Sequence, residues 1–321
     1  MRVFQLILIL LLCAVAVQTS AQPYPAKPVR VVVPYPPGGG NDTLGRLFAA
    51  KLGERMGQPF LVENRPGAGT MIGTEAAARS APDGYTILLS SIATHALSPN
   101  LYSRVPYDPV KDFAPITLLG IAPTVLVVSQ EVAAKNLQEL IALAKAKPGA
   151  LAYASGGNGT PPHINAEVFK AVAGIDLLHV AYKGGGPALV DLIAGRVHVM
   201  LDTAASAMSH VRSGKLRALA LSAPKRSPEY PDLPTFAEAG LPQYETNAWY
   251  SMHAPAGTPP EIVRRLNSEL VAILRDPEIL ARFRQLSTDP VGNSPEEFAA
   301  FVRSELDKYA RIIKAAGIKL D

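Results

Sequence analysis

Two glycine-rich turns, one in each half of the chain, link an apolar strand pattern to a helix pattern. The first, PYPPGGGND at residues 34–42, lies between Val29–Val33 and Thr43–Met56. The second, KGGGP at residues 183–187, lies between Leu178–Tyr182 and Ala188–Ala194. Glycine lets the backbone approach a ligand closely, and a helix start offers unpaired N–H groups at the positive end of the helix dipole. Because such turns bind anions, the pair predicts two lobes that grip one anionic ligand.

Strand and helix patterns alternate along the rest of the chain, which predicts βαβ units and an α/β fold with mainly parallel sheets flanked by helices. The expected strands are Val29–Val33, Phe60–Glu63, Tyr85–Ser90, Ile116–Leu119, Thr124–Val128, Leu151–Ala154, Leu178–Tyr182, Val197–Leu201, Leu216–Leu221 and Ser251–Ala254. The expected helices are Thr43–Met56, Met71–Arg79, Leu137–Lys147, Pro162–Ala173, Ala188–Ala194, Ala204–Ser213, Thr235–Ala239, Pro260–Arg275, Pro277–Gln285 and Pro295–Ala316.

The domain division follows from the absence of any linker-like segment in the sequence. With 321 residues the chain fits about two domains. Strands must then cross between the lobes, and the stretches 116–129 and 244–255 are the best candidates. We expect one lobe at 22–123 plus 250–321 and an inserted second lobe at 124–249, so that each lobe carries one glycine turn.

The N-terminus has the pattern of a secretory signal peptide at residues 1–21. Arg2 precedes an apolar run from Leu6 to Val17, and cleavage is expected after Ala21. The run is shorter than the ~20 apolar residues of a membrane-spanning helix. The only cysteine, Cys13, lies inside this run, so the mature chain would have no thiol for disulfides, catalysis or metal binding. The sequence predicts a soluble exported protein.

Composition and motifs exclude several functions. The formal net charge is +4, but the basic residues are scattered, so the footprint of a nucleic-acid-binding protein is missing. Neither glycine turn is a phosphate-binding Walker loop, and no serine has the G-x-S-x-G frame of a hydrolase. The six histidines lack the spacing of a zinc site. We therefore expect no metal, no cofactor and no enzymatic activity.

Small polar loops follow several of the expected strands. In open α/β sheets, ligands bind outside the carboxyl ends of strands, so these loops should converge on one cleft. Asp42 lies at a helix start, where an aspartate usually caps the helix and fixes a loop, although a role as general acid or base stays open. Asp202 could face an amine or brace its loop. His163 begins a helix and could line the cleft.

The chain resembles the Bug (TctC-like) family of periplasmic solute-binding receptors of tripartite tricarboxylate transporters. The resemblance is carried, in order, by PYPPGGGND (34–42), VENRPGAG (62–69), APDGYT (81–86), YKGGGPA (182–188) and APAGTP (254–259). It covers essentially the whole mature chain. It implies a two-lobed periplasmic binding fold that closes on a carboxylated ligand, held through backbone amides and ordered water by the loops 35–43 and 182–186.

Together these arguments predict a receptor that captures a small carboxylate for uptake or sensing. The expected partners are membrane permease subunits or a sensor protein, and the receptor itself is expected to be a monomer. The alternative is a periplasmic hydrolase or isomerase acting on an anionic substrate through Asp42, Asp202 or His163, and a scaffold without a small ligand is a third possibility. The expected ligand-binding residues are Tyr35, Gly38, Gly39, Gly40, Asn41, Asp42, Thr43, Ser91, Thr94, Ser155, Thr160, His163, Tyr182, Gly184, Gly185, Gly186 and Asp202.

The far wall of the expected cleft has hydroxyls and one acid but no evident arginine. A second strong negative charge on the ligand would therefore lack a bidentate partner. We expect a monocarboxylate, a zwitterion, or a dicarboxylate whose distal end is held by hydroxyls and water, in preference to citrate.

Overall fold

A computed structural model describes residues 24–38, 40–315 and 317–319, so the expected signal peptide and Gly39 lie outside the described residues. Within them the strands form a ten-stranded mixed sheet whose main order is β2-β1-β3-β9-β4-β7-β5-β6, with β8 and β10 also paired to β4. The strands are β1 (Val29–Val33), β2 (Phe60–Asn64), β3 (Thr86–Ser91), β4 (Phe113–Ser129), β5 (Ala152–Ser155), β6 (Leu178–Ala181), β7 (Val199–Thr203), β8 (Leu216–Ser222), β9 (Asn247–Pro255) and β10 (Asp289–Pro290).

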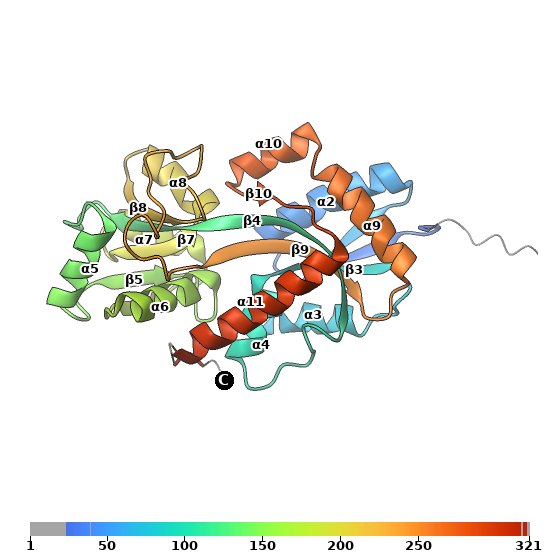
Figure 1. Ribbon diagram of the computed structural model, residues 1–321, viewed down its shortest axis with the longest axis horizontal. Helices are drawn as coiled ribbons and strands as arrows, with labels where there is room; N and C mark the ends of the chain where they lie inside the picture. The colour runs from blue at the N-terminus through green and yellow to red at the C-terminus, as the bar shows by residue number, and fades with distance from the viewer. Residues whose placement is uncertain (1–23, 39, 316, 320–321) are drawn as a thin grey trace, which may run out of the picture.

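The helices cover both faces of this sheet (Figure 1). They are α2 (Gly40–Met56), α3 (Met71–Ala78), α4 (Ser98–Leu101), α5 (Leu137–Ala146), α6 (Pro161–Ala173), α7 (Gly185–Ile193), α8 (Ala204–Arg212), α9 (Pro260–Ile273), α10 (Pro277–Gln285) and α11 (Pro295–Ala315). A short 3-10 turn, η1 (Ala68–Thr70), precedes α3, and a π-helical turn, η2 (Ala93–Leu97), follows β3. None of the helices in the described ranges is both long and apolar enough to cross a bilayer.

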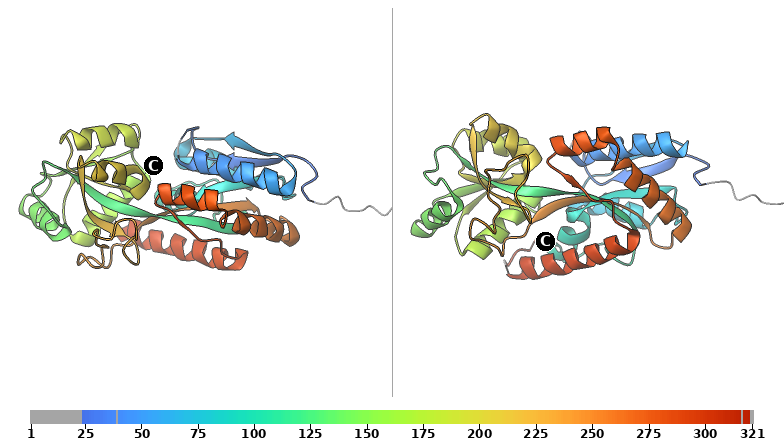
Figure 2. Two further views of the ribbon diagram at one scale, coloured as in Figure 1. Left: turned by 90° about the horizontal axis from the view of Figure 1, so that it is seen from above. Right: turned by 45° about the horizontal axis from the view of Figure 1, so that its top comes forward.

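The elements gather into two lobes, joined by the long strands β4 and β9 (Figures 1 and 2). The first lobe contains β1–β3, α2–α4, α9 and α10, and the second contains β5–β8 and α5–α8. β4 pairs antiparallel with β9 through its first half and with β7 and β8 through its second half. The outer strands β2-β1-β3 and β6-β5-β7 are parallel. Antiparallel pairing is thus concentrated where the chain passes between the lobes.

The strand predictions agree well with the structure, with one informative difference. The two strands expected at 116–119 and 124–128 are one continuous 17-residue strand, β4. The intervening residues 120–123 look like a turn in the sequence, but their partners on β9 keep them extended, with register shifts near Pro115 and Leu118. β10 was not expected, because its two residues have no strand pattern of their own and pair only with Gly120 and Ile121.

Most helices begin and end close to where the sequence places them. The start of α5 shows why: Asn136 accepts a hydrogen bond from the Glu139 N–H at 2.9 Å, and the Glu139 side chain accepts one in return from the Lys135 N–H at 2.7 Å. The helix expected at Thr235–Ala239 is wrong. This segment is a run of turns, in which Thr235 forms a bridge with Leu221 and Phe236 N–H donates to the carbonyl oxygen of Leu221.

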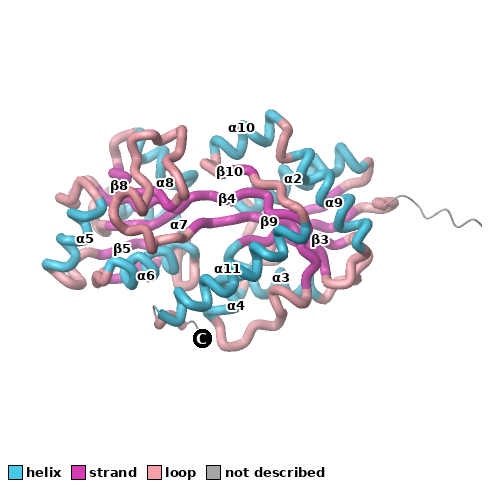
Figure 3. The backbone as a smooth tube through the Cα atoms, in the orientation of Figure 1, coloured by secondary structure: helices cyan, strands magenta, loops and turns pink. Residues whose placement is uncertain are grey.

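The apolar core is divided in the same way as the lobes, except along α11. Val31, Phe48 and Leu270 belong to a cluster of the first lobe, and Ala154 and Met200 belong to one of the second. α11 runs alongside both (Figures 1 and 3): it contacts α4 and α9 of the first lobe and α6 of the second. A third cluster joins the buried side chains of α11 to residues of both lobes. The C-terminal helix therefore supports both lobes together with β4 and β9.

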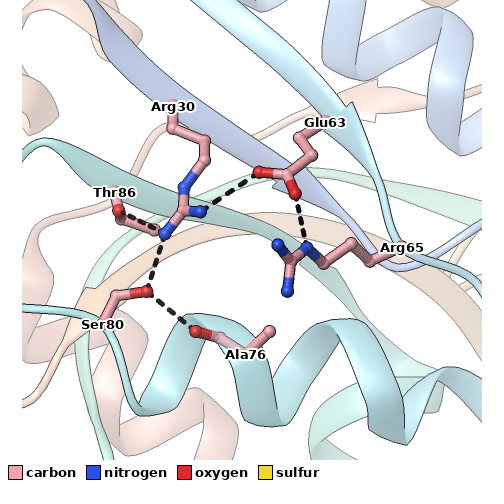
Figure 4. Close-up of polar contacts among 6 residues, drawn as sticks. All are labelled: Arg30, Glu63, Arg65, Ala76, Ser80 and Thr86. Carbon is pink, nitrogen blue, oxygen red and sulfur yellow. Dashed lines mark hydrogen bonds and ion pairs between the residues drawn. The ribbon is translucent and has the colours of Figure 1, made fainter.

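A polar network ties together the outer strands of the first lobe (Figure 4). Arg30 of β1 donates to Glu63 of β2 at 3.2 Å, to Thr86 of β3 at 3.1 Å and to Ser80 after α3 at 3.0 Å. Arg65 reaches the other oxygen of Glu63 from the exposed end of β2. These two guanidinium groups lower the pKa of the Glu63 carboxyl, with the Arg65 hydrogen bond as the largest cause. Arg30 thus connects three strands, whereas Arg65 connects neighbouring residues of one strand.

We predict that Arg30→Met lowers the free energy of unfolding by about 1 kcal/mol, because it leaves Glu63 with only one cationic partner and removes cross-strand hydrogen bonds. Arg65→Met is the matched control and should change stability by less than about 0.5 kcal/mol, as expected for an exposed pair. Urea unfolding curves of the two variants measure the difference. Equal effects would contradict the role assigned to Arg30.

Candidate functional site

A cavity of about 170 Å³ lies between the two lobes, beside the strands that join them. The first lobe contributes the loop after β1, the start of α2 and the end of β3. The second lobe contributes the start of α6 and the end of β7, and the crossing strand β9 lies between them. Its lining residues are Tyr35, Asn41, Ser91, Ile92, Pro161, Pro162, Asn165, Asp202, Thr203, Ala248, Trp249 and Tyr250.

Hydroxyl groups form the wall from the first lobe. The Tyr35 hydroxyl and the Ser91 Oγ are 2.5 Å apart, and Ser91 Oγ also accepts from the Ala93 N–H at 3.1 Å. Ser91 lies opposite Tyr250 in the β3–β9 register, which brings the second phenol to the same wall. Burial raises the pKa of Tyr35 well above its ordinary value and raises that of Tyr250 to about 12. Both phenols are therefore neutral hydrogen-bonding groups at neutral pH.

Asp42 fixes the first glycine turn from within the first turn of α2. Its carboxylate accepts from the Gly38 N–H at 2.9 Å, from Arg46 at 3.0 Å and from the Asn64 side chain at 2.8 Å. These hydrogen bonds, with Arg46 the largest cause, lower its pKa to about 2. Asp42 is not the cap of α2, because it is the third residue of the helix and accepts from the Gly38 N–H before it, but these contacts support the loop-fixing role that was expected with the cap. With every bond directed to the loop and its neighbours, Asp42 is poorly placed to be a general acid or base.

The second lobe contributes amide, carboxyl and hydroxyl groups to the cavity. Asn165, on α6, donates to Thr124 Oγ1 at 3.1 Å. Asp202, at the end of β7, is 8% exposed and accepts from the Thr203 N–H at 2.7 Å. Burial raises the pKa of Asp202, partly offset by hydrogen bonds from Ser206 and the Thr203 backbone. Trp249 is buried beside them, and its indole N–H donates to Glu305 of α11 at 3.0 Å.

The second glycine turn lies next to Asp202 at the start of α7. A Cβ added to Gly185 would meet only the Asp202 Oδ2, at 4.0 Å, and one added to Gly186 would meet nothing within 4 Å. Gly184 has φ +119°, a backbone conformation that only glycine adopts readily. Gly185 and Gly186 are therefore open to an approaching ligand, whereas the Gly184 N–H already donates to the Gly156 carbonyl at 3.1 Å. The Tyr182 hydroxyl does not take part, because it donates to Asp191 at 2.8 Å.

Several expected site residues hold the loops in shape instead of lining the cavity. Thr94 Oγ1 accepts from the Ser91 N–H, and Thr160 Oγ1 donates to the Gly157 carbonyl. Ser155 Oγ pairs with His179 Nε2 at 2.7 Å. His163 Nδ1 accepts from the Gly159 N–H at 3.1 Å, while its ring stacks on His179, and burial lowers its pKa to about 4. Of the expected residues, the ones that line the cavity are Tyr35, Asn41, Ser91 and Asp202.

Sequence reasoning did not single out Asn165, Trp249 or Tyr250, and it included Thr203 only as part of a polar loop after a strand, although all four line the cavity. Asn165 lies inside a helix, and Trp249 and Tyr250 lie in a strand that was expected to begin only at Ser251. The boundaries between strands and loops in the sequence do not indicate that β9 reaches the cavity. The position of β9 beside β3 depends on pairing between residues far apart in the sequence. Trp249 did have one recognisable signal, since it is the only tryptophan of the chain.

The cavity is polar without being basic. No lysine, arginine or histidine is among its lining residues, and Asp202 is the one ionisable acid there. Across the described part of the chain, no group of three or more His, Cys, Asp or Glu side chains is arranged to hold a metal ion. The arrangement suits a small polar solute bound by hydroxyls, amides and backbone N–H groups.

Comparison with known proteins identifies relatives over nearly the full length. The family model described as "Tripartite tricarboxylate transporter family receptor" matches residues 44–318. Protein BugT of Bordetella pertussis is 38% identical over 307 residues, covering 95% of this chain and 94% of that protein.

Solved structures agree with this relationship. "R. palustris Rpa4515 with adipate" is 36% identical with a TM-score of 0.83, covering 92% of this chain and 99% of that one. "MatC (Rpa3494) from Rhodopseudomonas palustris with bound malate" is 32% identical with a TM-score of 0.79, covering 90% and 100%. A "Structure of periplasmic binding protein BugD" is 35% identical with a TM-score of 0.80, covering 92% and 99%.

We predict that Asp42→Asn lowers the free energy of unfolding at pH 7 by about 1.5–3 kcal/mol, the range for hydrogen bonds to a charged group. Because the folded-state pKa of Asp42 is depressed, its stabilisation is complete above the unfolded-state pKa near 4 and is lost as pH falls toward 2. The difference between wild type and variant should therefore shrink between pH 5 and pH 2. Denaturant unfolding across this range measures it, and a constant difference would contradict the assignment.

Proposed function

This chain belongs to the tripartite tricarboxylate transporter receptor family, whose members are solute-binding receptors and not enzymes, and we propose that it captures a small carboxylate in the cavity between its two lobes. The observation that carries the proposal is the cavity itself. It lies between the lobes, and hydroxyl, amide and carboxyl groups from both lobes line it. The names of two relatives, which record adipate and malate as bound molecules, support a carboxylate as the ligand.

The carboxylate would be held mainly by backbone N–H groups. Residues 35–43 include the start of α2 at Gly40, and residues 182–186 include the start of α7 at Gly185, so both glycine turns lie at the positive end of a helix dipole. Ser91 and Tyr35 stand beside the first turn and could donate through their hydroxyls. In this arrangement Thr94, Ser155, Thr160 and His163 act indirectly, by fixing the loops.

The lining also bears on which carboxylate fits. Because it includes no lysine or arginine, a second full negative charge would have no ion-pair partner. This favours a monocarboxylate, a zwitterion, or a dicarboxylate whose far end is bound by Tyr250, Thr203, Asn165 and water. Citrate, with three carboxylates, should bind more weakly.

The proposal includes the biological setting. The family and its structural neighbours are periplasmic binding proteins, and residues 1–21 have the pattern of an export signal. We expect the mature receptor to act as a monomer and to deliver its solute to membrane permease subunits or to a sensor. The division at 22–123 plus 250–321 and 124–249 is the one that assigns a glycine turn to each lobe.

We predict that at least one small carboxylate binds with a dissociation constant in the micromolar range or tighter. The panel should include acetate, adipate, malate, glutamate and citrate, titrated calorimetrically into protein that has been unfolded and refolded to remove endogenous ligand. Trp249 lines the cavity and is the only tryptophan, so binding should also change the intrinsic fluorescence. Failure of every anion, or citrate binding tightest, would contradict the proposal.

A second prediction separates backbone from side-chain recognition. Gly185→Val should abolish binding without unfolding the protein, because its φ is not in the left-handed region and the added Cβ would meet only Asp202 Oδ2. Lys183→Ala, on the same turn, should weaken binding by about 1 kcal/mol, since an exposed charge contributes little. Calorimetry gives both affinities, and thermal unfolding checks the fold. The reverse order of effects would mean that a side-chain cation, and not the backbone, holds the anion.

A further inference from the structure

Asp202 brings a carboxyl group to the cavity that is proposed to hold a ligand carboxylate. Its side chain is buried at the end of β7 and lines the cavity. Oδ1 accepts from the Thr203 N–H at 2.7 Å, whereas Oδ2 lies 4.0 Å from where a Cβ of Gly185 would be. Oδ2 therefore faces the start of α7, the place where the proposed function puts a ligand carboxylate.

The surroundings of Asp202 offer no cation to balance two negative charges. Its side chain is in no ion pair among the described residues, and the titratable groups that share its cavity are the phenols of Tyr35 and Tyr250. On α6, His163 is turned toward Gly159 and His179 and does not line the cavity. Lys183, before the second glycine turn, is exposed and also lies outside the lining. A ligand carboxylate at α7 would thus meet an unpaired carboxylate.

Two carboxyl groups that share one site without a cation cannot both be ionised at low cost, and they commonly share a proton. Building on the proposed function, we propose that carboxylate binding is coupled to the uptake of one proton by Asp202, so that its Oδ2–H donates a hydrogen bond to the ligand carboxylate. The proton comes from solvent and returns there when the ligand leaves. No covalent bond other than this O–H forms or breaks.

The local chemistry supports this assignment. Burial already raises the pKa of Asp202, and a nearby ligand anion raises it further. The coupling gives binding a pH dependence with a definite sign. Above the free-protein pKa of Asp202, affinity falls with rising pH, by up to about tenfold per unit, until the pKa of the complex is passed.

The test uses calorimetry of the full mature protein with adipate, malate and glutamate as probes, between pH 5.5 and pH 8, in buffers of differing ionisation enthalpy. For the carboxylates that bind, the measured enthalpy should depend on the buffer, with a slope that indicates uptake of up to one proton. Asp202→Asn should remove this dependence, because its amide N–H donates without titrating. The variant should still bind, and its affinity should no longer change with pH.

Asp108→Asn is the matched control, because Asp108 lies outside the cavity lining and, like Asp202, accepts hydrogen bonds from backbone N–H groups, at 2.9 Å from Val110 and Lys111. It should leave the proton count unchanged. Binding without proton uptake in the wild type would overturn the proposal even if Asp202→Asn fails to fold. If Asp202→Asn loses only glutamate binding, Asp202 is instead a partner of the ligand's ammonium group. If Asp202→Asn takes up as many protons on binding as the wild type, Asp202 only braces α8. If no probe binds at all, the proposed function fails first, which is a different result from binding without protons.

Discussion

The pairing of β4 with β9 is the constraint on which the rest of the structure depends. These two strands carry the chain between the lobes, and their register determines which residues lie beside the cavity. Pro123 pairs with Asn247 and Ile121 with Trp249, so the segment Ala248–Tyr250 lies where the lobes meet. Gly120 allows close packing here, because a Cβ would come within 2.7 Å of Phe283 on α10. The crossing is therefore held by packing from the first lobe as well as by its own hydrogen bonds.

Much of the fold could be predicted because its local signals agree with its tertiary structure. Val29–Val33 is apolar except for Arg30 and its four valines are buried, and Pro277–Gln285 begins with a proline directly after the capping Asp276. The wrong predictions fall where contacts with residues distant in the sequence determine the local structure. Residues 120–123 look like a break in the sequence and are held extended by β9, whereas Thr235–Ala239 has helix-forming residues but is fixed as turns by its contacts with Leu221.

The part of the candidate site that could be predicted is the part formed by polar residues near the carboxyl ends of strands. Tyr35, Ser91 and Asp202 lie at or just after the ends of strands, Asn41 lies at the start of α2, and all four line the cavity. The sequence cannot show whether a hydroxyl is free to bind a ligand or already forms a hydrogen bond within the protein. The hydroxyls of Thr94 and Thr160 each form a hydrogen bond within their own loop. Trp249 and Tyr250 could not be found by this logic, because strand register alone brings them to the cavity.

The charge distribution of the cavity suggests how one receptor fold can serve different carboxylates. An arginine would hold an anion strongly but would also fix the geometry of its carboxylate through a bidentate pair. Backbone N–H groups, neutral phenols and hydroxyls bind one carboxylate and leave the rest of the ligand to a wall that differs in shape and polarity. In this chain the buried Asp202 lies beside the second glycine turn, where the proposal places that carboxylate, and its own charge must be neutralised by a proton or by the ligand. Selectivity would then depend on the protonation of one side chain as well as on the shape of the cavity, because a ligand that cannot satisfy Asp202 leaves a buried charge without a partner.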